Sequence, residues 1–303
     1  MKRILITGGT GFFGKSMLDY RLRHEMQIDE EWIVVSRNPI EFLNGCPQFA
    51  HMPGVRFVVG DVLQGGVLAG DENLGGVDAI IHAAAVLDPS APEDMILSAA
   101  IDGTRHVISL ARKVGCNKIL FTSSGAVYGQ CSLPACESDE CIPDTPYGRG
   151  KLAAERLLVD SGLDIKLARC FSFVGPHLNR GIHFAIGNFI QNCVDGNPIV
   201  INGDGTPLRS YLYADDLVEW LFAILERGES GRPYNVGSDR ALSIRELAEA
   251  VRAVLGSKSE IVVKGTPTIG AKPSVYVPAI DRARSELGLE VKVSLEDAIR
   301  FSV

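Results

Sequence analysis

The sequence lacks the marks of a membrane, secreted or nucleic-acid-binding protein. No apolar run approaches the roughly 20 residues that cross a bilayer, and MKRILITGG turns to glycine too early for a signal peptide. The seven cysteines are odd in number and form no CxxC pair, so we expect no disulfide framework. A net charge of −7 without a cluster of basic residues does not suit nucleic acid or anionic membranes. We therefore expect a cytoplasmic protein that binds neither.

The sequence does contain a regular alternation of apolar runs and helix-like segments. The apolar runs are RILITGG, WIVVSR, VRFVVGD, DAIIHAAA and KILFTSS. Strands that are apolar on both faces and separated by helices are typical of a parallel sheet covered on each side. The expected fold class is therefore α/β, with a Rossmann-type doubly wound parallel sheet.

Turn signals become frequent after Val174, where GPHLNRG, DGNP and NGDGTP separate helices expected near 183–195, 215–227 and 243–255. This change predicts a Rossmann domain over residues 1–175, rejoined by part of 212–240. Residues 176–303 then form a smaller lobe that mainly binds substrate. Because no polar linker separates the two lobes, we expect them to share a cleft.

The segment TGGTGFFG, residues 7–14, follows the first expected strand and opens the first expected helix. Gly8, Gly11 and Gly14 are spaced three residues apart, and their missing side chains let backbone N–H groups and a helix N-terminus approach a pyrophosphate. A merely tight turn is the alternative, but the strand-turn-helix position favours dinucleotide binding. The cofactor contacts expected here come from Gly8, Thr10, Gly11, Phe12, Phe13 and Gly14.

The second expected strand ends near residue 36, where NAD-binding folds usually place an acidic residue on the ribose. This sequence has Ser36 and Arg37 there. A hydroxyl and a guanidinium suit a 2′-phosphate, so NADP(H) is favoured over NAD(H), although a solvated arginine would give the same pattern. Asp61 either accepts a hydrogen bond from the adenine amino group or acts as a plain strand-end residue.

The segment YGRGK places Tyr147 and Lys151 four positions apart at the start of an expected helix. This spacing by itself says only that the two side chains share a helical face. The ordered series TGGTGFFG, GDV, HAAA, TSSGAVYG and YGRGK, however, resembles the extended short-chain dehydrogenases/reductases that act on nucleotide sugars. The resemblance continues through ARCFSFVGP, NGDGTPLRSYLYADDL and YNVGSDRALSIREL to DRARSELGLEVKVSLEDAI. It covers nearly the whole chain.

The resemblance implies that Ser124, Tyr147 and Lys151 form a catalytic triad. A phenol with a pKa of about 10 is a poor base near neutrality, and the charge of Lys151 favours its phenolate. Tyr147 then exchanges a proton with a sugar hydroxyl during hydride transfer, while Ser124 holds the same oxygen. Strand-end and helix-start roles are the structural alternative.

The resemblance also implies a nucleoside-diphosphate sugar as substrate, further cofactor contacts and a homodimer formed through the helix after YGRGK. Tyr147 and Lys151 count among these cofactor contacts, together with Asp61, Val62, Ala83, Ala84 and Ala85. The expected substrate contacts are Ser124, Ala126, Ser172, Asn188, Arg209 and Lys272. Arg209 resembles the arginine that binds the diphosphate, although a surface arginine is the alternative.

Several positions depart from the pattern of the family. Ser172 stands where many members have asparagine, Ala100 replaces another common asparagine, and Lys272 takes the place of an expected arginine. The missing arginine leaves the base and the sugar of the substrate open, whereas Ala100 weakens detailed inference about its own helix but not about the triad. Gly125 and Ala126 stand where sugar 4,6-dehydratases carry an Asp-Glu pair, so we do not expect 4,6-dehydration.

These observations predict an NADPH-dependent reductase of a nucleoside-diphosphate 4-keto-6-deoxy sugar. An NAD-dependent nucleotide-sugar 4-epimerase would use the same triad and is the alternative. A non-enzymatic regulator that senses NADP is a third hypothesis, but it would not need the Tyr147–Lys151 pair.

Two further groups of side chains could form a site. Cys131, Cys136 and Cys141 are evenly spaced, but a structural zinc site uses four ligands in short pairs, so we expect no metal. His177 and His183, in HLNRGIH, either contact the substrate or are ordinary surface histidines.

Overall fold

The computed structural model describes residues 2–24, 30–64, 74–86, 91–181, 184–268, 270 and 272–303. The chain divides into two compact units, each assembled from separate stretches. Unit 1 consists of Met1–Gly129, Cys141–Arg169 and Leu221–Tyr234, and unit 2 of Gln130–Glu140, Cys170–Trp220 and Asn235–Val303. Within the described ranges, no helix combines the length and apolarity needed to cross a membrane.

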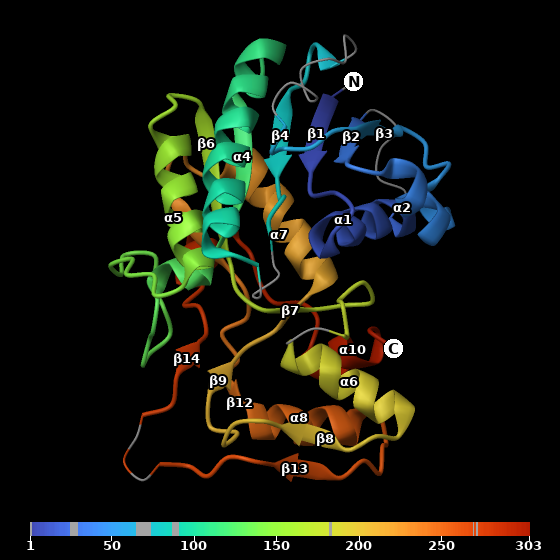
Figure 1. The fold of residues 1–303 in the computed structure, drawn as a ribbon, viewed down its shortest axis with the longest axis vertical. Helices are drawn as coiled ribbons and strands as arrows, with labels where there is room; N and C mark the ends of the chain where they lie inside the picture. Colours follow the sequence, from blue (N-terminus) through green and yellow to red (C-terminus); the bar gives the residue numbers. More distant parts are fainter. Residues whose placement is uncertain are drawn as a thin grey trace. The chain divides into compact units, whose positions relative to one another are not determined.

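A seven-stranded sheet is the centre of unit 1 (Figure 1). Its strands, in spatial order, are β11 (Pro233–Val236), β6 (Asp164–Cys170), β5 (Lys118–Ser124), β4 (Ala79–His82), β1 (Lys2–Thr7), β2 (Glu30–Ser36) and β3 (Val55–Val59). Strands β5, β4, β1, β2 and β3 run parallel, and the order reverses between β1 and β4. The predicted Rossmann-type doubly wound sheet is confirmed. Such a reversal is where open α/β sheets bind ligands.

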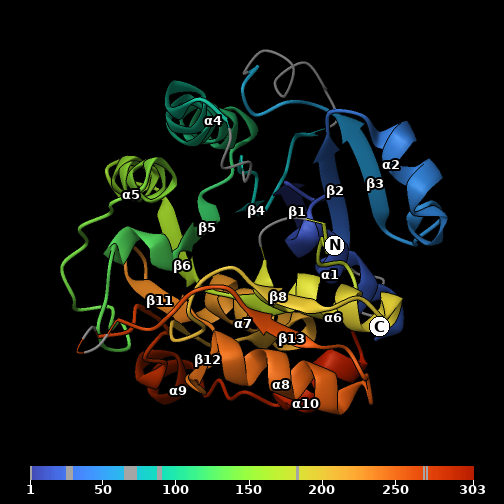
Figure 2. The same cartoon turned by 60° about the horizontal axis from the view of Figure 1, so that its bottom comes forward.

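The helical segments of unit 1 cover both faces of this sheet. They are α1 (Phe12–Arg23), α2 (Pro39–Gly45), η1 (Pro47–Phe49), α4 (Glu93–Val114), η3 (Gly125–Tyr128), α5 (Pro146–Val159) and the end of α7 (Ala214–Arg227). Leu5 and Ile33 pack with α4 and α5 in one buried cluster. On the other face Trp32 stacks on Phe222 of α7, with ring centroids 5.5 Å apart. Figure 2 shows α4 and α5 side by side.

Unit 2 combines short strands with the helices α6, α8, α9 and α10, whose bounds follow. Its elements are β7 (Phe173–Val174), α6 (Ala185–Asp195), β8 (Ile199–Ile201), β9 (Leu208–Arg209), β10 (Leu212–Tyr213), β12 (Leu242–Ser243), α8 (Ile244–Val254), β13 (Ile261–Val263), β14 (Val275–Tyr276), α9 (Asp281–Leu287) and α10 (Leu295–Arg300). Residues of α6, α8 and α10 share one apolar cluster. A capping box between Ser243 and Glu246 starts α8. The longest strands of this unit have three residues, so loops carry much of its backbone.

Candidate functional site

The glycine loop brings the backbone between β1 and α1 against the end of β4. A Cβ atom on Gly8 would lie 2.5 Å from the carbonyl carbon of Ala83, and the φ of Gly8 is +73°. A Cβ atom on Gly14 would lie 2.2 Å from the carbonyl carbon of Gly9. Gly11 occupies the N-cap of α1 and supplies no side-chain cap to the first turn. Uncapped N–H groups beside a closely packed glycine loop fit a pyrophosphate.

Thr10, Phe12 and Phe13 complete the predicted loop contacts. Thr10, Phe12 and Phe13 are all partly buried, and Phe12 and Phe13 meet edge to face with ring centroids 5.9 Å apart. Phe12 also begins α1, and its carbonyl oxygen accepts a hydrogen bond from Ser16 Oγ at 2.8 Å. The two rings thus lie at the start of α1, where the N–H groups of the first turn point out of the end of the helix.

The ends of β2 and β3 place the three residues predicted for the adenosine half of the cofactor. Ser36 is only 7% exposed, and its Oγ accepts a hydrogen bond from Asn38 N at 3.2 Å. Arg37, in contrast, is exposed. Asp61 is partly buried, and its Oδ1 accepts a hydrogen bond from Leu63 N at 3.0 Å. Of the pair predicted for a 2′-phosphate, Arg37 is therefore the side chain with access to solvent.

The segment after β4 supplies the predicted alanine contacts. Ala83 N donates to Thr7 O at 3.1 Å, which holds this segment beside the glycine loop. Ala84 and Ala85 both line a pocket of unit 1. Val62, another predicted cofactor contact, follows β3 and not β4. It packs near Gly103 of α4, because a Cβ atom added to Gly103 would lie 3.4 Å from Val62 Cγ2.

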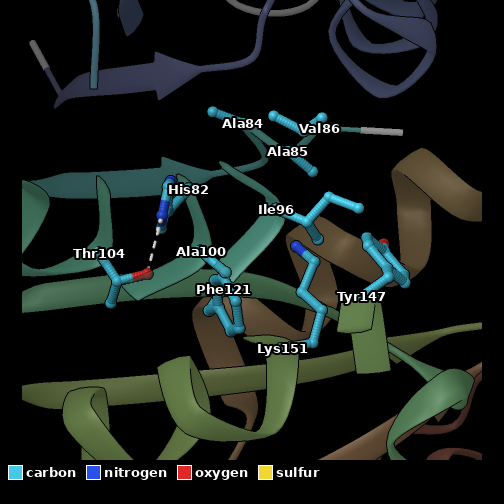
Figure 3. Close-up of a pocket in the computed structure, with 10 residues that line it drawn as sticks. All are labelled: His82, Ala84, Ala85, Val86, Ile96, Ala100, Thr104, Phe121, Tyr147 and Lys151. Carbon is cyan, nitrogen blue, oxygen red and sulfur yellow. Dashed lines mark hydrogen bonds between the residues drawn. The ribbon is translucent and has the colours of Figure 1, made fainter. Parts of the chain in front are cut away.

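Tyr147 and Lys151 both belong to this pocket (Figure 3). The pocket is lined by His82, Ala84, Ala85, Val86, Ile96, Ala100, Thr104, Phe121, Tyr147 and Lys151. Lys151 is 3% exposed, and its Nζ donates to Thr122 O at 2.7 Å. The same Nζ lies 4.6 Å from the ring centroid of Phe121 and 5.8 Å from that of Tyr147. A buried cation thus lies close to the phenol.

His82 is a pocket residue that the sequence did not reveal as one. Its Nδ1 lies 2.8 Å from Thr7 Oγ1, and its Nε2 lies 3.3 Å from Thr104 Oγ1. Burial, and after it the charge of Lys151, lowers the pKa of His82 to about 3. The imidazole is therefore neutral near pH 7. The only signal in the sequence was a histidine at the end of a buried strand, directly before AAA.

Ser124 ends β5 and is the N-cap residue of η3. It is 5% exposed, and its Oγ accepts a hydrogen bond from Ala126 N at 3.1 Å. The start of α5 packs closely on this turn, because a Cβ atom on Gly148 would lie 2.4 Å from Ala126 O. The glycine beside Tyr147 therefore lets α5 approach the segment that carries Ser124. The sequence alone gives no sign of this role of Gly148.

The remaining substrate-contact predictions fall in unit 2. Arg209 is partly buried in β9, and its Nη1 donates to Leu208 O at 2.8 Å and to Ser274 O at 3.4 Å. Burial lowers the pKa of Arg209, and its guanidinium lies 5.7 Å from the ring centroid of Tyr276. Lys272 is exposed. The guanidinium donates to carbonyl oxygens, which do not neutralise it, so its positive charge is still available to bind an anion.

Asn188 and Ser172 are held by backbone hydrogen bonds. Asn188 is partly buried in α6, and its backbone N donates to Phe184 O at 3.1 Å. Ser172 is partly buried between β6 and β7, and its carbonyl oxygen accepts from Leu212 N at 3.0 Å. Their predicted contacts with substrate stay predictions.

The cysteines and histidines considered as possible sites form no metal centre in the described part of the chain. Within it, no group of three or more His, Cys, Asp or Glu side chains could hold a metal ion. Burial raises the pKa of the Cys141 thiol, which opposes the thiolate that metal binding needs. His177 is partly buried. His183 lies outside the described residues.

Comparisons with known proteins match this chain over most of its length. A model of the family described as "NAD dependent epimerase/dehydratase family" matches residues 4–237. UDP-glucuronic acid decarboxylase 3 of Arabidopsis thaliana is 30% identical, over 98% of this chain and 86% of that protein. Both matches include the glycine loop, β5 and α5.

Two solved structures share the fold. The dTDP-glucose 4,6-dehydratase DesIV of Streptomyces venezuelae, with NAD and TYD bound, is 28% identical with a TM-score of 0.84, covering 99% of this chain and 96% of that one. The UDP-glucose 4-epimerase of Thermotoga maritima, with UDP-glucose, gives a TM-score of 0.86 at 24% identity, covering 99% and 97%. At 24% identity, the likeness to the epimerase shows a shared fold.

Proposed function

Because the chain belongs to the NAD-dependent epimerase/dehydratase family, we propose that it is an NADPH-dependent reductase of a nucleoside-diphosphate 4-keto-6-deoxy sugar. Residues 1–175, with part of 212–240, would bind the dinucleotide, and 176–303 mainly the sugar nucleotide. The family membership supports an enzyme that acts on nucleotide sugars. The direction of hydride transfer and the choice of cofactor are the finer steps of the proposal.

Tyr147, Lys151 and Ser124 are the proposed catalytic side chains. The bound dinucleotide supplies the hydride. Tyr147 gives its phenolic proton to the sugar oxygen, and the buried charge of Lys151 stabilises the phenolate that results. Ser124 donates its hydroxyl hydrogen to the same oxygen, which its Oγ can do while it still accepts from Ala126 N. The chain therefore needs to move only one proton.

The observation that carries this proposal is a turn without carboxylates beside Ser124. Gly125 and Ala126 form the start of η3, and the pocket-lining residues include no Asp or Glu. Eliminating water from a sugar needs an acid and a base beside the reacting carbons. This turn offers neither, whereas a ketone reduction needs only the phenol and the lysine.

An NAD-dependent 4-epimerase is the second candidate, and the end of β2 favours it. The Ser36 hydroxyl is buried, and its oxygen accepts a hydrogen bond from Asn38 N. It is therefore poorly accessible to a 2′-phosphate. DesIV, at 28% identity, is a structure with NAD bound. An epimerase would use Tyr147 in both directions and show no net consumption of cofactor.

The test is an incubation of the purified protein with a thymidine- or cytidine-diphosphate 4-keto-6-deoxyglucose and NADPH or NADH. The reductase proposal predicts that one NADPH is oxidised for each keto sugar consumed, and that NADPH is used faster than NADH. Absorbance of the reduced nicotinamide and chromatography of the sugar nucleotides measure the two sides of this balance.

A second incubation with an ordinary nucleoside-diphosphate hexose and no added cofactor decides between the candidates. Isomerised sugar nucleotide, together with NAD that copurifies with the protein, would reject the reductase in favour of the epimerase. A new 4-keto sugar formed by loss of water would contradict both, because it would show that Gly125 and Ala126 do not prevent elimination.

A further inference from the structure

Four buried polar side chains of unit 1 form a connected group that the proposed reaction does not use. Glu155 and Arg169 are paired twice, by Arg169 Nη2 to Oε2 at 2.9 Å and by Arg169 Nε to Oε1 at 3.1 Å. Arg169 Nη1 also donates to the hydroxyl of Tyr128 at 3.0 Å, and Ser123 Oγ donates to Glu155 Oε1. All four residues are at most 7% exposed. We call them the Glu155 network.

Two members of the Glu155 network fasten the segment that carries Ser124. Ser123 precedes Ser124 at the end of β5, and Tyr128 is the last residue of η3. The guanidinium of Arg169 also lies 4.9 Å from the ring centroid of Tyr128. Both ends of the turn that begins at Ser124 are therefore tied to the same ion pair.

A third connection reaches Lys151. Glu155 lies four residues after Lys151 in α5, one helical turn along the same face. Lys151 donates to Thr122 O, and Glu155 accepts from Ser123 Oγ. Successive residues of β5 are thus bound by successive turns of α5. The end of the strand and the helix cannot slide past each other without breaking both contacts.

We infer that the Glu155 network is a positioning device for the proposed triad, fixing Ser124 relative to Lys151 and Tyr147. The inference rests on the proposed function, because it concerns the same three side chains. Its members touch neither substrate nor cofactor in this account and act through Ser124 and Lys151. Fixing a hydrogen-bond donor within a fraction of an ångström strongly affects the rate of a positioned reaction.

The electrostatics of the network support a role in specifying geometry. Burial by itself would lower the pKa of Arg169, but the hydrogen bonds and charge of Glu155 raise it above its ordinary value. The pair is neutral as a whole and adds no net charge beside Tyr147. Well-packed apolar residues often replace such pairs without loss of stability, so a buried pair is weak evidence for a stabilising role.

Single-atom deletions test the inference with little disturbance of the fold. Tyr128→Phe removes only the hydroxyl that accepts from Arg169. Tyr234→Phe is the matched control, because Tyr234 is 1% exposed and its hydroxyl accepts from Glu229 N at 3.2 Å, outside the network. We expect Tyr128→Phe to lower kcat for the keto sugar about tenfold, with KM and dinucleotide binding nearly unchanged. The control should keep the wild-type kcat.

A spectroscopic readout makes the test independent of the substrate. Tyrosines labelled with carbon-13 at Cζ are titrated by NMR in the full chain, and Tyr147→Phe assigns the resonance of Tyr147. Lys151 is the charged residue that lines the pocket with Tyr147, and His82 stays neutral there. If Ser123 secures the contact of Lys151 with Thr122, Ser123→Ala should move the Tyr147 titration to higher pH, while Tyr234→Phe leaves it in place.

The outcomes separate this inference from the proposed function. Equal kcat in Tyr128→Phe and Tyr234→Phe would overturn the positioning role while the reductase stands. If the wild type turns over no keto sugar, the proposed reaction fails, and the titration alone decides. An unchanged Tyr147 titration in Ser123→Ala would then reject the inference, and an upward shift would support it.

Discussion

Lys151 in unit 1 and Arg209 in unit 2 are both cations proposed for the reaction, and the two units hold them differently. Lys151 comes from a 14-residue helix, is 3% exposed and donates to the carbonyl of a strand in a seven-stranded sheet. Arg209 comes from a two-residue strand and donates to the carbonyl oxygens of Leu208 and Ser274. Long regular elements fix Lys151, whereas short strands and loops present Arg209.

This difference fits the different tasks that the proposed reaction gives to the two cations. A group that stabilises a phenolate must keep its position, because the pKa of Tyr147 depends on the distance between the charges. A group that binds a diphosphate tolerates movement, and loops are where recognition varies between related proteins. Substitutions in unit 1 should therefore change chemistry and folding, and those in unit 2 should change substrate affinity.

Tyr147→Phe should have the largest effect of any single substitution. Removing the phenolic oxygen removes the proposed proton donor, so kcat should fall about a thousandfold. The phenylalanine keeps the aromatic ring that lies near Lys151 Nζ, so dinucleotide affinity should stay within about twofold. Nicotinamide absorbance measures the first and fluorescence titration the second. A variant with the wild-type rate would remove Tyr147 from the mechanism.

Gly8→Ala should be the most destabilising change in the cofactor half. The new Cβ would overlap Ala83, 2.5 Å away, on a backbone with φ of +73°. We expect a loss of at least about 3 kcal/mol in the free energy of unfolding. Gly162→Ala is the control, because Gly162 has φ of +75° with no atom within 4 Å of the new Cβ. It should cost only about 1–2 kcal/mol.

Urea unfolding of the two glycine variants measures this difference. Because both substitutions force a side chain into the left-handed region, the excess in Gly8→Ala reports the close approach of the loop to β4. Equal losses in the two variants would mean that the loop relaxes around the new methyl group, and the packed cradle proposed for the pyrophosphate would be wrong.

The local patterns of the sequence predicted the sheet and the helices well. The second strand was expected to end near residue 36, and β2 is Glu30–Ser36. Helices expected near 183–195, 215–227 and 243–255 appear as α6, α7 and α8 within two residues of those starts. Periodicity and turn residues are local signals, and these elements depend on local signals.

The sequence did not predict features that depend on contacts between distant segments. Nothing near Gly148 shows that its missing side chain admits Ala126 O. His82 meets Thr7 and Thr104 only after β1, β4 and α4 have assembled. The stretch 130–140 joins unit 2 although its neighbours on both sides belong to unit 1. Such approaches are set by tertiary packing.

His82 should make the stability of the protein depend on acid pH. Its folded-state pKa of about 3 lies below the value of about 6.5 expected in the unfolded chain. Between these values the unfolded state binds the extra proton. The free energy of unfolding is therefore unaffected by the titration of His82 above about pH 6.5. It falls by about 1.4 kcal/mol per pH unit as the pH drops from there toward 3. His82→Gln should remove this slope, measured by urea unfolding across the same range.

The absolute stability of His82→Gln is a separate matter, because the variant also loses the contacts with Thr7 and Thr104. Only the dependence on pH reports the titration. If wild type and variant lose stability in parallel as the pH falls, the histidine does not carry the acid sensitivity of unit 1.

Arg209→Ala should show that Arg209 and Lys151 have different roles. Its loss should raise the KM for the sugar nucleotide about tenfold and leave kcat nearly unchanged, because the guanidinium binds ground state and transition state alike. Arg240→Ala is the control in the same unit, since Arg240 is exposed and paired with Glu296 at 2.8 Å. Steady-state kinetics in the sugar nucleotide measure both. A fall in kcat with constant KM would place Arg209 in the chemical step and contradict the different tasks proposed for Arg209 and Lys151.

Arg37→Ala should have the smallest effect and bears on the cofactor. An exposed guanidinium at the end of β2 is screened by salt, so its contact with a 2′-phosphate should change affinity only about fivefold. We expect the KM for NADPH to rise by that factor and the KM for NADH to stay constant. Arg105→Ala, which removes an exposed arginine paired with Asp102 on α4, should change neither. Equal changes for the two cofactors would show that Arg37 does not distinguish them, and the buried hydroxyl of Ser36 would then favour NAD.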